Sequence, residues 1–276
     1  MRITILSENR ARKRGVRGEH GLSLLVEAQG RRILFDAGQS ELLLHNAAVL
    51  ETELSGLDAV VLSHGHYDHA GGIPAVCRLN PGVPLYLGAD AFGLRYNAVA
   101  GEAVGRPIGI PWERERLPET TPVVLCREPL TLFPGMMLSG PTPRLSGEAS
   151  PSFLRADAEG HLRQDPVAEE CFLALRHREG IVVVTGCSHG GILSSITQAL
   201  SFWRGLPLRA VIGGFHLEQA GPGQLETVLE ALSRYPEAYL YPLHCTGQVA
   251  AVRMKDRFQD RCGLLCAGDT LTLEEA

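Results

Sequence analysis

The sequence has no long apolar run and no excess of basic residues. No stretch is apolar over enough residues to span a bilayer, and residues 1–10 carry only a short apolar run without a basic leader. The 26 lysines and arginines are outnumbered by 31 aspartates and glutamates, which leaves a net charge of -5. No broad basic surface is therefore available to neutralise nucleic-acid phosphates. These absences predict a soluble cytoplasmic protein that binds a small molecule rather than nucleic acid or a membrane.

The cysteines do not have the pattern of a disulfide framework. There are seven, an odd number, scattered through a chain without an export signal. Cys262 and Cys266 lie close together, but no second pair exists to complete a four-ligand zinc site, so we interpret them as buried structural residues. A hydrophobic content of 45% over 276 residues is enough for a sizeable buried core.

Short β-like runs rich in Val, Ile, Leu or Phe recur along the chain and are bounded by Gly, Pro or Asp. They cover residues 2–7, 22–28, 32–35, 59–62, 84–87, 123–125, 136–138, 171–175, 181–185, 210–212 and 239–243. Helical spacing of apolar residues appears at 40–50, 192–203, 225–232 and, more weakly, 249–258. Two β-rich halves with one-sided helices predict one α/β domain over residues 1–276, with two sheets inside and helices outside.

Residues from about 88 to 122 differ from this pattern. Gly and Pro recur there, apolar periodicity is lost, and arginines accumulate, namely Arg95, Arg106, Arg114 and Arg116. A long irregular segment within a compact domain is often functional, so we predict a lid-like insertion. Together with Arg144, these arginines could meet an anionic substrate, because guanidinium groups bind phosphate and carboxylate in a bidentate way. The alternative is ordinary solvated surface charge.

A dense group of metal-ligand residues follows the β-run at 59–62. His64 and His66 are two residues apart, so in an extended segment their rings point to the same side. Asp68 and His69 follow at a turn, where neighbouring side chains can point in different directions. One short segment could thus supply ligands to two neighbouring metal ions. Imidazole and carboxylate ligands suit zinc, with manganese or iron as alternatives.

Four ligands do not complete two catalytic sites, because each metal normally takes about three protein ligands and a water. Three further histidines follow β-runs and stand beside glycine, and they could converge on one edge of the sheets: His189, His216 and His244. Three others lack that context and are interpreted as surface residues: His45, His161 and His177.

The His-x-His-x-Asp-His segment after a strand resembles the metallo-β-lactamase superfamily. Over nearly its full length the chain is similar to the branch of metal-dependent hydrolases and dihydropterin-methyl-ribofuranosylaminobenzene-phosphate synthases. The matching segments are residues 19–23, 34–39, 62–69, 185–189, 213–217 and 244–247. The resemblance implies a four-layer αββα sandwich with the active site at the edge of the two sheets.

The chain also departs from the wider superfamily. Where many members have a third-motif histidine, residues 139–143 read Ser-Gly-Pro-Thr-Pro and offer no ligand, so His189 is the candidate substitute. Cys187 stands where many members place a bridging aspartate, and its thiolate could ligate a metal or its side chain could simply pack. His244 matches the final-motif histidine, whereas His216 could be a metal ligand or a substrate contact.

These residues predict an enzyme with two divalent metal ions, zinc above all, that activates water to attack an ester or phosphoester. The catalytic residues would be His64, His66 and Asp68, with Asp68 ligating or orienting the water. Asp36, at a strand end, could hold a ligand histidine from behind or could merely form a turn. The substrate would be a small molecule, and the resemblance makes an anionic or pterin-related one conceivable.

Several alternatives remain open. One is a pterin-type condensing synthase that displaces pyrophosphate on the same metals. Another is a serine hydrolase, because Gly186-Cys187-Ser188-His189-Gly190 lies between a strand and a helix, as a nucleophilic serine does. That alternative leaves the histidine cluster without a purpose. Two further alternatives are a redox di-iron centre and a metal-binding module without catalytic activity.

Overall fold

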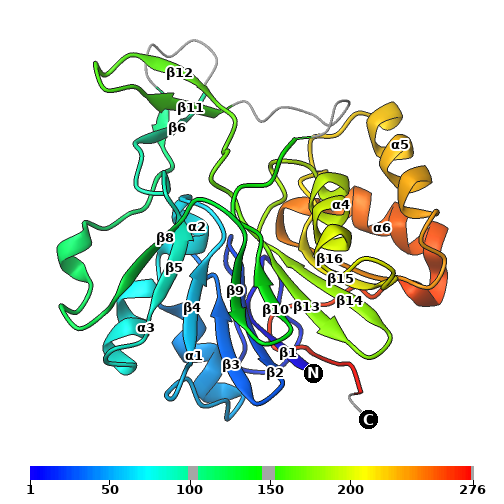
Figure 1. Cartoon of the computed structure of the whole chain (residues 1–276), viewed down its shortest axis with the longest axis horizontal. Helices are drawn as coiled ribbons and strands as arrows, with labels where there is room; N and C mark the ends of the chain where they lie inside the picture. Colours follow the sequence, from blue (N-terminus) through cyan, green and yellow to red (C-terminus); the bar gives the residue numbers. More distant parts are fainter. Residues whose placement is uncertain (99–104, 145–152, 275–276) are drawn as a thin grey trace.

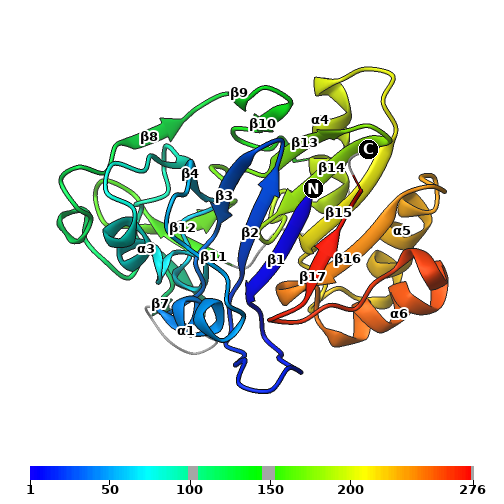
Figure 2. The ribbon, with the colours of Figure 1, turned by 90° about the horizontal axis from the view of Figure 1, so that it is seen from below.

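The computed structural model describes residues 1–98, 105–144 and 153–274, and its core is built from two sheets (Figure 1). The first sheet has seven strands. In spatial order these are β17 (Thr270–Thr272), β1 (Arg2–Ser7), β2 (Ser23–Ala28), β3 (Arg31–Phe35), β4 (Ala59–Leu62), β5 (Leu85–Gly88) and β8 (Val123–Cys126). β17 pairs with β1 although the two are far apart in sequence, as Figure 2 shows.

The second sheet has six strands. In spatial order these are β16 (Tyr239–Leu243), β15 (Leu208–Gly214), β14 (Gly180–Thr185), β13 (Leu173–His177), β10 (Met136–Leu138) and β9 (Leu130–Phe133). Most of the β-runs predicted from the sequence are found in these two sheets, and the runs at 2–7, 59–62, 136–138 and 239–243 have the predicted ends.

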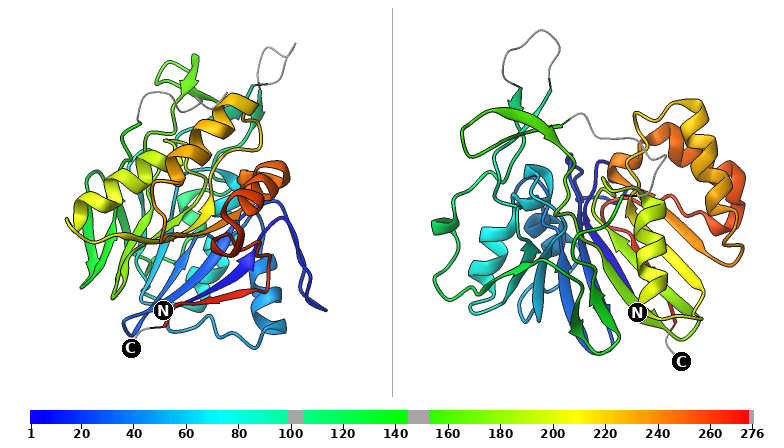
Figure 3. Two further views of the ribbon diagram at one scale, coloured as in Figure 1. Left: turned by 90° about the vertical axis from the view of Figure 1, so that its right-hand side faces the viewer. Right: turned by 45° about the horizontal axis from the view of Figure 1, so that its top comes forward.

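Three buried apolar clusters define the layers. One lies between the sheets and combines side chains of both, such as Ile5 and Val61 from the first and Val184 and Ile212 from the second. A second cluster packs the other face of the second sheet against α4 (Ile192–Phe202), α5 (Pro222–Leu232) and α6 (Gln248–Phe258). A third packs the first sheet against α1 (Leu42–Val49) and α3 (Ile73–Leu79). The four-layer αββα prediction is therefore confirmed, and Figure 3 shows helices on both outer faces.

The candidate site residues follow the parallel strands of both sheets. β3, β4, β5 and β8 are parallel in the first sheet, and β14, β15 and β16 are parallel in the second. Asp36 follows β3, His64 follows β4, Cys187 follows β14, His216 follows β15 and His244 follows β16. Because ligands in α/β folds bind beyond the carboxyl ends of parallel strands, this topology places residues from both sheets at one edge.

The segment at 88–122 is not irregular throughout its described part. It contributes β6 (Arg95–Asn97) and β7 (Arg106–Pro107), which join β11 (Phe153–Ala156) and β12 (Leu162–Asp165) in a third sheet that the sequence did not predict. It also contains the short 3-10 helix η1 (Arg114–Arg116). Residues 99–104 of the predicted insertion lie outside the described residues. In Figure 1 this small sheet lies above the ends of the central strands.

The helices predicted at 192–203, 225–232 and 249–258 are confirmed as α4, α5 and α6, and the helix predicted at 40–50 is confirmed as α1. Two short helices were missed: α2 (Tyr67–Ala70), which carries Asp68 and His69, and α3. Among the described residues, no helix has both the length and the apolar character that a membrane span requires.

Candidate metal centre

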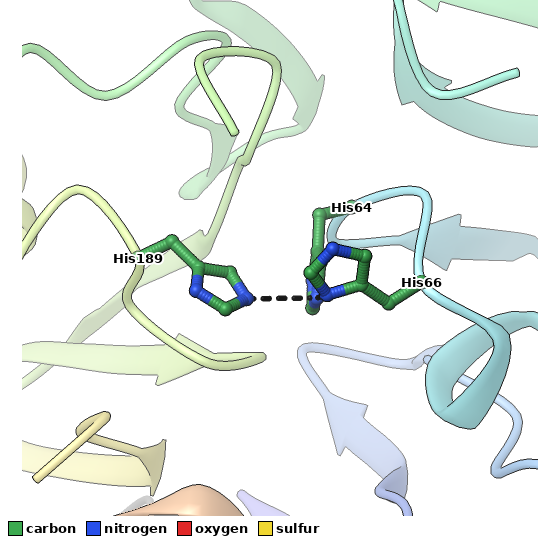
Figure 4. A group of neighbouring side chains, drawn as sticks. All are labelled: His64, His66 and His189. Carbon is green, nitrogen blue, oxygen red and sulfur yellow. Dashed lines mark hydrogen bonds between the residues drawn. The ribbon is translucent and has the colours of Figure 1, made fainter. Parts of the chain in front are cut away.

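Three histidine rings converge from the two sheets, as Figure 4 shows. His64 Nε2 lies 3.0 Å from His66 Nδ1 and 3.1 Å from His189 Nε2. His64 and His66 come from the loop after β4, and His189 comes from the loop between β14 and α4. All three side chains are buried. The structure thus brings together three of the histidines that the sequence predicts as metal ligands.

The loop that carries His64 and His66 is close-packed. Gly65, between the two histidines, has no room for a side chain, because a Cβ there would overlap the carbonyl oxygen of Ala91. Its N–H donates to Glu169 Oε1 at 3.3 Å. Gly190, directly after His189, donates its N–H to Glu170 Oε2 at 3.0 Å. Two adjacent buried carboxylates therefore each hold one of the loops that bring these histidines together.

Arg95 stabilises the carboxylate of Glu169, which binds the loop of His64 and His66. Its guanidinium is buried and pairs with Glu169 Oε1 at 2.7 Å and Asp165 Oδ2 at 2.8 Å. It also donates to the carbonyl oxygens of Ala91 and Asp90. The alternative that Arg95 is ordinary solvated surface charge was wrong, because its guanidinium is buried and is neutralised by two buried carboxylates.

Hydrogen bonds fix which nitrogen of His64 faces the cluster. Ser63 Oγ donates to Asp36 Oδ2 at 2.8 Å, so its lone pair accepts from His64 Nδ1 at 2.9 Å. His64 Nε2 then carries no proton and presents a lone pair to the other two rings. Asp36 Oδ1 also accepts from the N–H of Ser63 at 2.7 Å. Asp36 therefore orients His64 through Ser63.

A second group lies beside the first. Asp68 Oδ2 lies 3.3 Å from His244 Nε2 and 3.8 Å from His69 Nε2. His69 Nε2 also lies 3.1 Å from Cys187 Sγ. The rings of His64 and His69 are 4.3 Å apart between centroids, so the two groups adjoin. The structure brings Asp68, His69, His244 and Cys187 together, as the ligand prediction requires.

A hydrogen bond from Nδ1 orients each of the rings of His69 and His244. His69 Nδ1 donates to Asp36 Oδ2 at 2.6 Å. His244 Nδ1 donates to Asn9 Oδ1 at 2.8 Å, and its backbone N–H donates to Glu8 Oε1. In each ring Nε2 is then the atom that faces Asp68. Carboxylate and amide partners of this kind commonly orient metal-binding histidines.

His20 belongs to this group and was missed by sequence reasoning. Its Nε2 lies 3.1 Å from Asp68 Oδ2, and its ring is 4.9 Å from that of His244 between centroids. It stands in a loop between β1 and β2 rather than at a parallel strand end, which is why the strand-end criterion missed it. The available signal was its place in residues 19–23, one of the segments that resemble the family.

His216, Ser188 and Arg144 lie around the first cluster. The ring of His216 is 4.4 Å from that of His189 between centroids, and Phe153 packs against both rings. Ser188 adopts a positive φ of 61°, but its buried Oγ donates to the carbonyl oxygen of Gly214 at 2.8 Å. Arg144 donates to the carbonyl oxygen of His189 at 2.6 Å. The hydroxyl of Ser188 is thus engaged with the backbone, which disfavours its role as a nucleophile.

The three histidines that were interpreted as surface residues differ in their burial. His161 is exposed on the turn between β11 and β12, and His45 binds the carbonyl oxygen of Gly15 near the surface. His177 is buried and contacts the carbonyl oxygen of Glu274, so its interpretation as a surface residue was wrong. The reason is packing at the end of β13, which the sequence pattern does not show. Cys262 and Cys266 are buried, as expected.

Burial and neighbouring charges shift the pKa values of the cluster in opposite directions. Burial lowers the pKa of His66 to about 3 and lowers the pKa values of His64 and His189 well below the ordinary value. Burial also acts to lower the pKa of His69, but the carboxylates of Asp36 and Asp68 outweigh it and raise that pKa to about 9. The first group therefore presents neutral imidazoles, whereas the two carboxylates favour a proton on His69.

The donor set fits divalent cations. Ligands about 2.0–2.1 Å from a tetrahedral zinc ion lie about 3.3 Å apart, close to the 3.0 and 3.1 Å between the three imidazole nitrogens. His66 Nε2 and His189 Nδ1 are buried atoms without a hydrogen-bond partner among the described residues. Because His64 Nε2 carries no proton, it accepts hydrogen bonds from the N–H groups of the other two rings, and a divalent cation would take the place of those protons. The ligand atoms of His64, His66 and His189 lie within 4.8 Å of one another and could hold one cation, and those of His64, His69 and Cys187 form an adjoining group of the same kind.

Comparisons with known proteins show which family the chain resembles. The family model described as the metallo-beta-lactamase superfamily matches residues 16–196. An uncharacterised protein of Methanocaldococcus jannaschii is 32% identical over 256 residues, which cover 91% of this chain and 93% of that protein. A second protein of that organism, named 7,8-dihydropterin-6-methyl-4-(beta-D-ribofuranosyl)-aminobenzene-5'-phosphate synthase, is 28% identical and covers 91% of this chain and 88% of its own. A crystal structure described as a metal-dependent hydrolase of the beta-lactamase superfamily has a TM-score of 0.84 at 30% identity, covering 99% of both chains.

Proposed function

Because this chain belongs to the metallo-beta-lactamase superfamily, we propose that it is a metal-dependent hydrolase of an ester or phosphoester in a small anionic molecule. The observation that carries the proposal is the convergence of His64 Nε2, His66 Nδ1 and His189 Nε2 beside the group around Asp68. Three buried neutral imidazoles aimed at one point have no other evident use in the fold. Two divalent cations, zinc before manganese or iron, are the proposed cofactors.

Each residue has a proposed role. His64, His66 and His189 would hold one cation, and Asp68, His69 and His244 would hold the other, while Cys187 lies between the two groups. Such cations lower the pKa of water to about 7, which supplies a nucleophile near neutral pH, and they stabilise negative charge that develops on the substrate. Asp68 would orient the attacking water through its carboxylate. Phe153 covers the rings of His66 and His189 and so limits access of bulk water from that side.

A cavity that meets the ligand loop at Tyr67, and that none of the proposed metal ligands lines, has a shape and lining suited to a substrate with a flat ring. It has a volume of about 590 Å³, and Tyr67, between the ligand residues His66 and Asp68, forms part of its wall. Tyr96, Trp112 and Arg114 also line it. Aromatic side chains stack on flat rings, and a guanidinium favours an anionic group. This lining is compatible with a phosphorylated or pterin-related molecule.

A second candidate is the condensing reaction indicated by the relative's name. In that reaction an aminobenzene nitrogen would attack the methyl carbon of a dihydropterin-methyl diphosphate, and pyrophosphate would leave. The same cations would stabilise the leaving group. The observation in favour is the likeness to the named synthase over 91% of this chain.

The test is turnover by the purified protein on a panel of carboxylic esters, phosphomonoesters and phosphodiesters, with pyrophosphate release from the condensation assayed in parallel. We expect activity that a chelator abolishes and added zinc or manganese restores. Asp68→Ala should remove it, whereas His161→Ala, at an exposed turn, should not. Metal binding without turnover in any assay would favour a silent binding module. Pyrophosphate release without hydrolysis would favour the synthase.

A further inference from the structure

We propose that His20 is a metal ligand of the second group, together with Asp68 and His244. This inference rests on the proposed metal-dependent function and adds a ligand to it. The three ligand atoms, His20 Nε2, Asp68 Oδ2 and His244 Nε2, lie within 4.8 Å of one another. They come from the loop between β1 and β2, from α2 and from the 3-10 helix η2 (His244–Thr246).

The distances fit coordination around one point. Asp68 Oδ2 is 3.1 Å from His20 Nε2 and 3.3 Å from His244 Nε2. Ligands of a tetrahedral zinc ion are spaced by about 3.3 Å. His244 donates from Nδ1 to Asn9 Oδ1, so its Nε2 presents a lone pair to the carboxylate oxygen of Asp68. A lone pair and a carboxylate oxygen at that distance repel each other, and a cation between them turns the repulsion into binding.

The backbone holds His20 against the site. The N–H of Leu22 donates to the carbonyl oxygen of Asp68 at 3.2 Å. The N–H of Gly21 donates to Asn9 Oδ1 at 3.3 Å, the same atom that accepts from His244. One amide oxygen thus fixes both the ring of His244 and the segment that carries His20.

Gly21 permits this close approach. Its φ is 147°, and a Cβ at that position would overlap the carbonyl oxygen of Asp68. A side chain there would push the His20 segment away from α2. Glu19, on the other side of His20, contacts Ser7 Oγ at 3.0 Å and Ser40 Oγ at 2.5 Å. His20 therefore stands in an anchored segment, although its side chain is 51% exposed.

The exposure of His20 distinguishes it from the other proposed ligands. His69 and His244 are buried, with exposed side-chain fractions of 0% and 1%. A third ligand on the solvent side would let the second group bind a cation without requiring the thiolate of Cys187.

The experiment measures metal stoichiometry and affinity by competition with a chromogenic chelator, using zinc on metal-free full-length protein. The variants are His20→Ala, His20→Gln and, as a histidine control, His45→Ala, whose ring contacts the carbonyl oxygen of Gly15. Cobalt substitution adds the visible absorption spectrum, which reports the ligands of each ion. We expect two equivalents in the wild-type protein and in the control. In both His20 variants the first equivalent should bind unchanged, and the second should bind at least tenfold more weakly with an altered cobalt spectrum.

Two results would overturn the inference while leaving the proposed function intact. One is a second equivalent that binds both His20 variants as tightly as the wild type with the same cobalt spectrum. The other is a wild-type protein that binds one equivalent only, which would leave the proposed hydrolase with one cation instead of two. Wild-type protein that binds no zinc would overturn the inference and the proposed function together. Circular dichroism of each variant confirms that the half-exposed site tolerates the substitution.

Discussion

The carboxylate of Asp36 accepts a 2.6 Å hydrogen bond from Nδ1 of His69, and both side chains are fully buried. The same oxygen accepts from Ser63 Oγ, which in turn holds His64. One carboxylate therefore orients a histidine of each group. The sequence left two interpretations of Asp36 open, a residue that holds a ligand histidine and a residue that forms a turn. Both describe part of its role, because Asp36 also adopts a positive φ of 58° at the turn after β3.

Replacing Asp36 should weaken both metal sites. In Asp36→Asn the neutral amide is a poorer acceptor for His69 and Ser63, so the two rings lose their fixed tautomers. Removing such a partner typically lowers metal affinity by about 10- to 100-fold. Chelator competition measures the affinity, and Asp260→Asn, on the surface, serves as the control. Unchanged affinity for both equivalents would show that Asp36 only forms the turn.

Removing Arg95 should destabilise the protein. Arg95→Met leaves Asp165 and Glu169 as buried carboxylates without their cation, which costs about 3–5 kcal/mol of unfolding free energy. Urea denaturation measures the loss. The exposed Arg106 offers a matched control, since Arg106→Met should change stability by no more than about 0.5 kcal/mol. A loss for Arg95→Met as small as that for the control would contradict the assigned ion pairs.

The buried carboxyl of Glu170 should give the metal-free protein a pH-dependent stability. Burial raises its pKa from 4.5 to about 7. Between these values the folded chain keeps a proton that the unfolded chain has released, so the unfolding free energy should fall as pH rises from about 4.5 to 7. In Glu170→Gln this contribution disappears, while the amide oxygen can still accept from Gly190.

Denaturation of chelator-treated protein across that pH range tests the effect. The difference in stability between Glu170→Gln and the wild type should grow in favour of the variant as pH rises. Glu230→Gln, at an exposed position on α5, should follow the wild type at every pH. A constant difference across the range would mean that Glu170 ionises in the folded protein at its ordinary pKa.

Ser188→Ala separates the metal-dependent reaction from a serine hydrolase. The hydroxyl donates to the carbonyl oxygen of Gly214, so its removal should cost about 1 kcal/mol of stability and leave turnover within a few fold of the wild type. Steady-state kinetics on the best substrate of the panel measures turnover. Loss of activity by several orders of magnitude, together with resistance to chelators, would restore the serine mechanism.

Much of the fold followed from the sequence because its signals are local. The alternation of β-runs and one-sided helices predicted both sheets and the helices α4, α5 and α6. The third sheet was missed because β6, β7, β11 and β12 are short and partly polar, and their pairing joins distant segments. Such pairing depends on tertiary contacts rather than on local propensity.

The candidate site was predicted where the ligands follow strands. His64, His66, Asp68 and His69 share one segment, and His189 and His244 stand at strand ends beside glycine. His20 was not found because it does not follow a parallel strand, although its segment, residues 19–23, resembles the family. The roles of Glu169, Glu170 and Arg95 were likewise hidden, since charged residues in a sequence are normally assigned to the surface and only the packed structure shows them buried.

The pairing of β1 with β17 has a consequence for synthesis of the chain. Thr4 lies opposite Thr270, and their hydroxyls are 3.4 Å apart across a separation of 266 residues. A ribosome that makes about 5–20 residues per second leaves the edge of β1 unpaired for roughly 10–50 seconds. His244 emerges in the same late interval. During synthesis the chain would therefore have both an unpaired edge at β1 and an ion site that lacks His244. Both would be completed at almost the same time, once the last part of the chain is made.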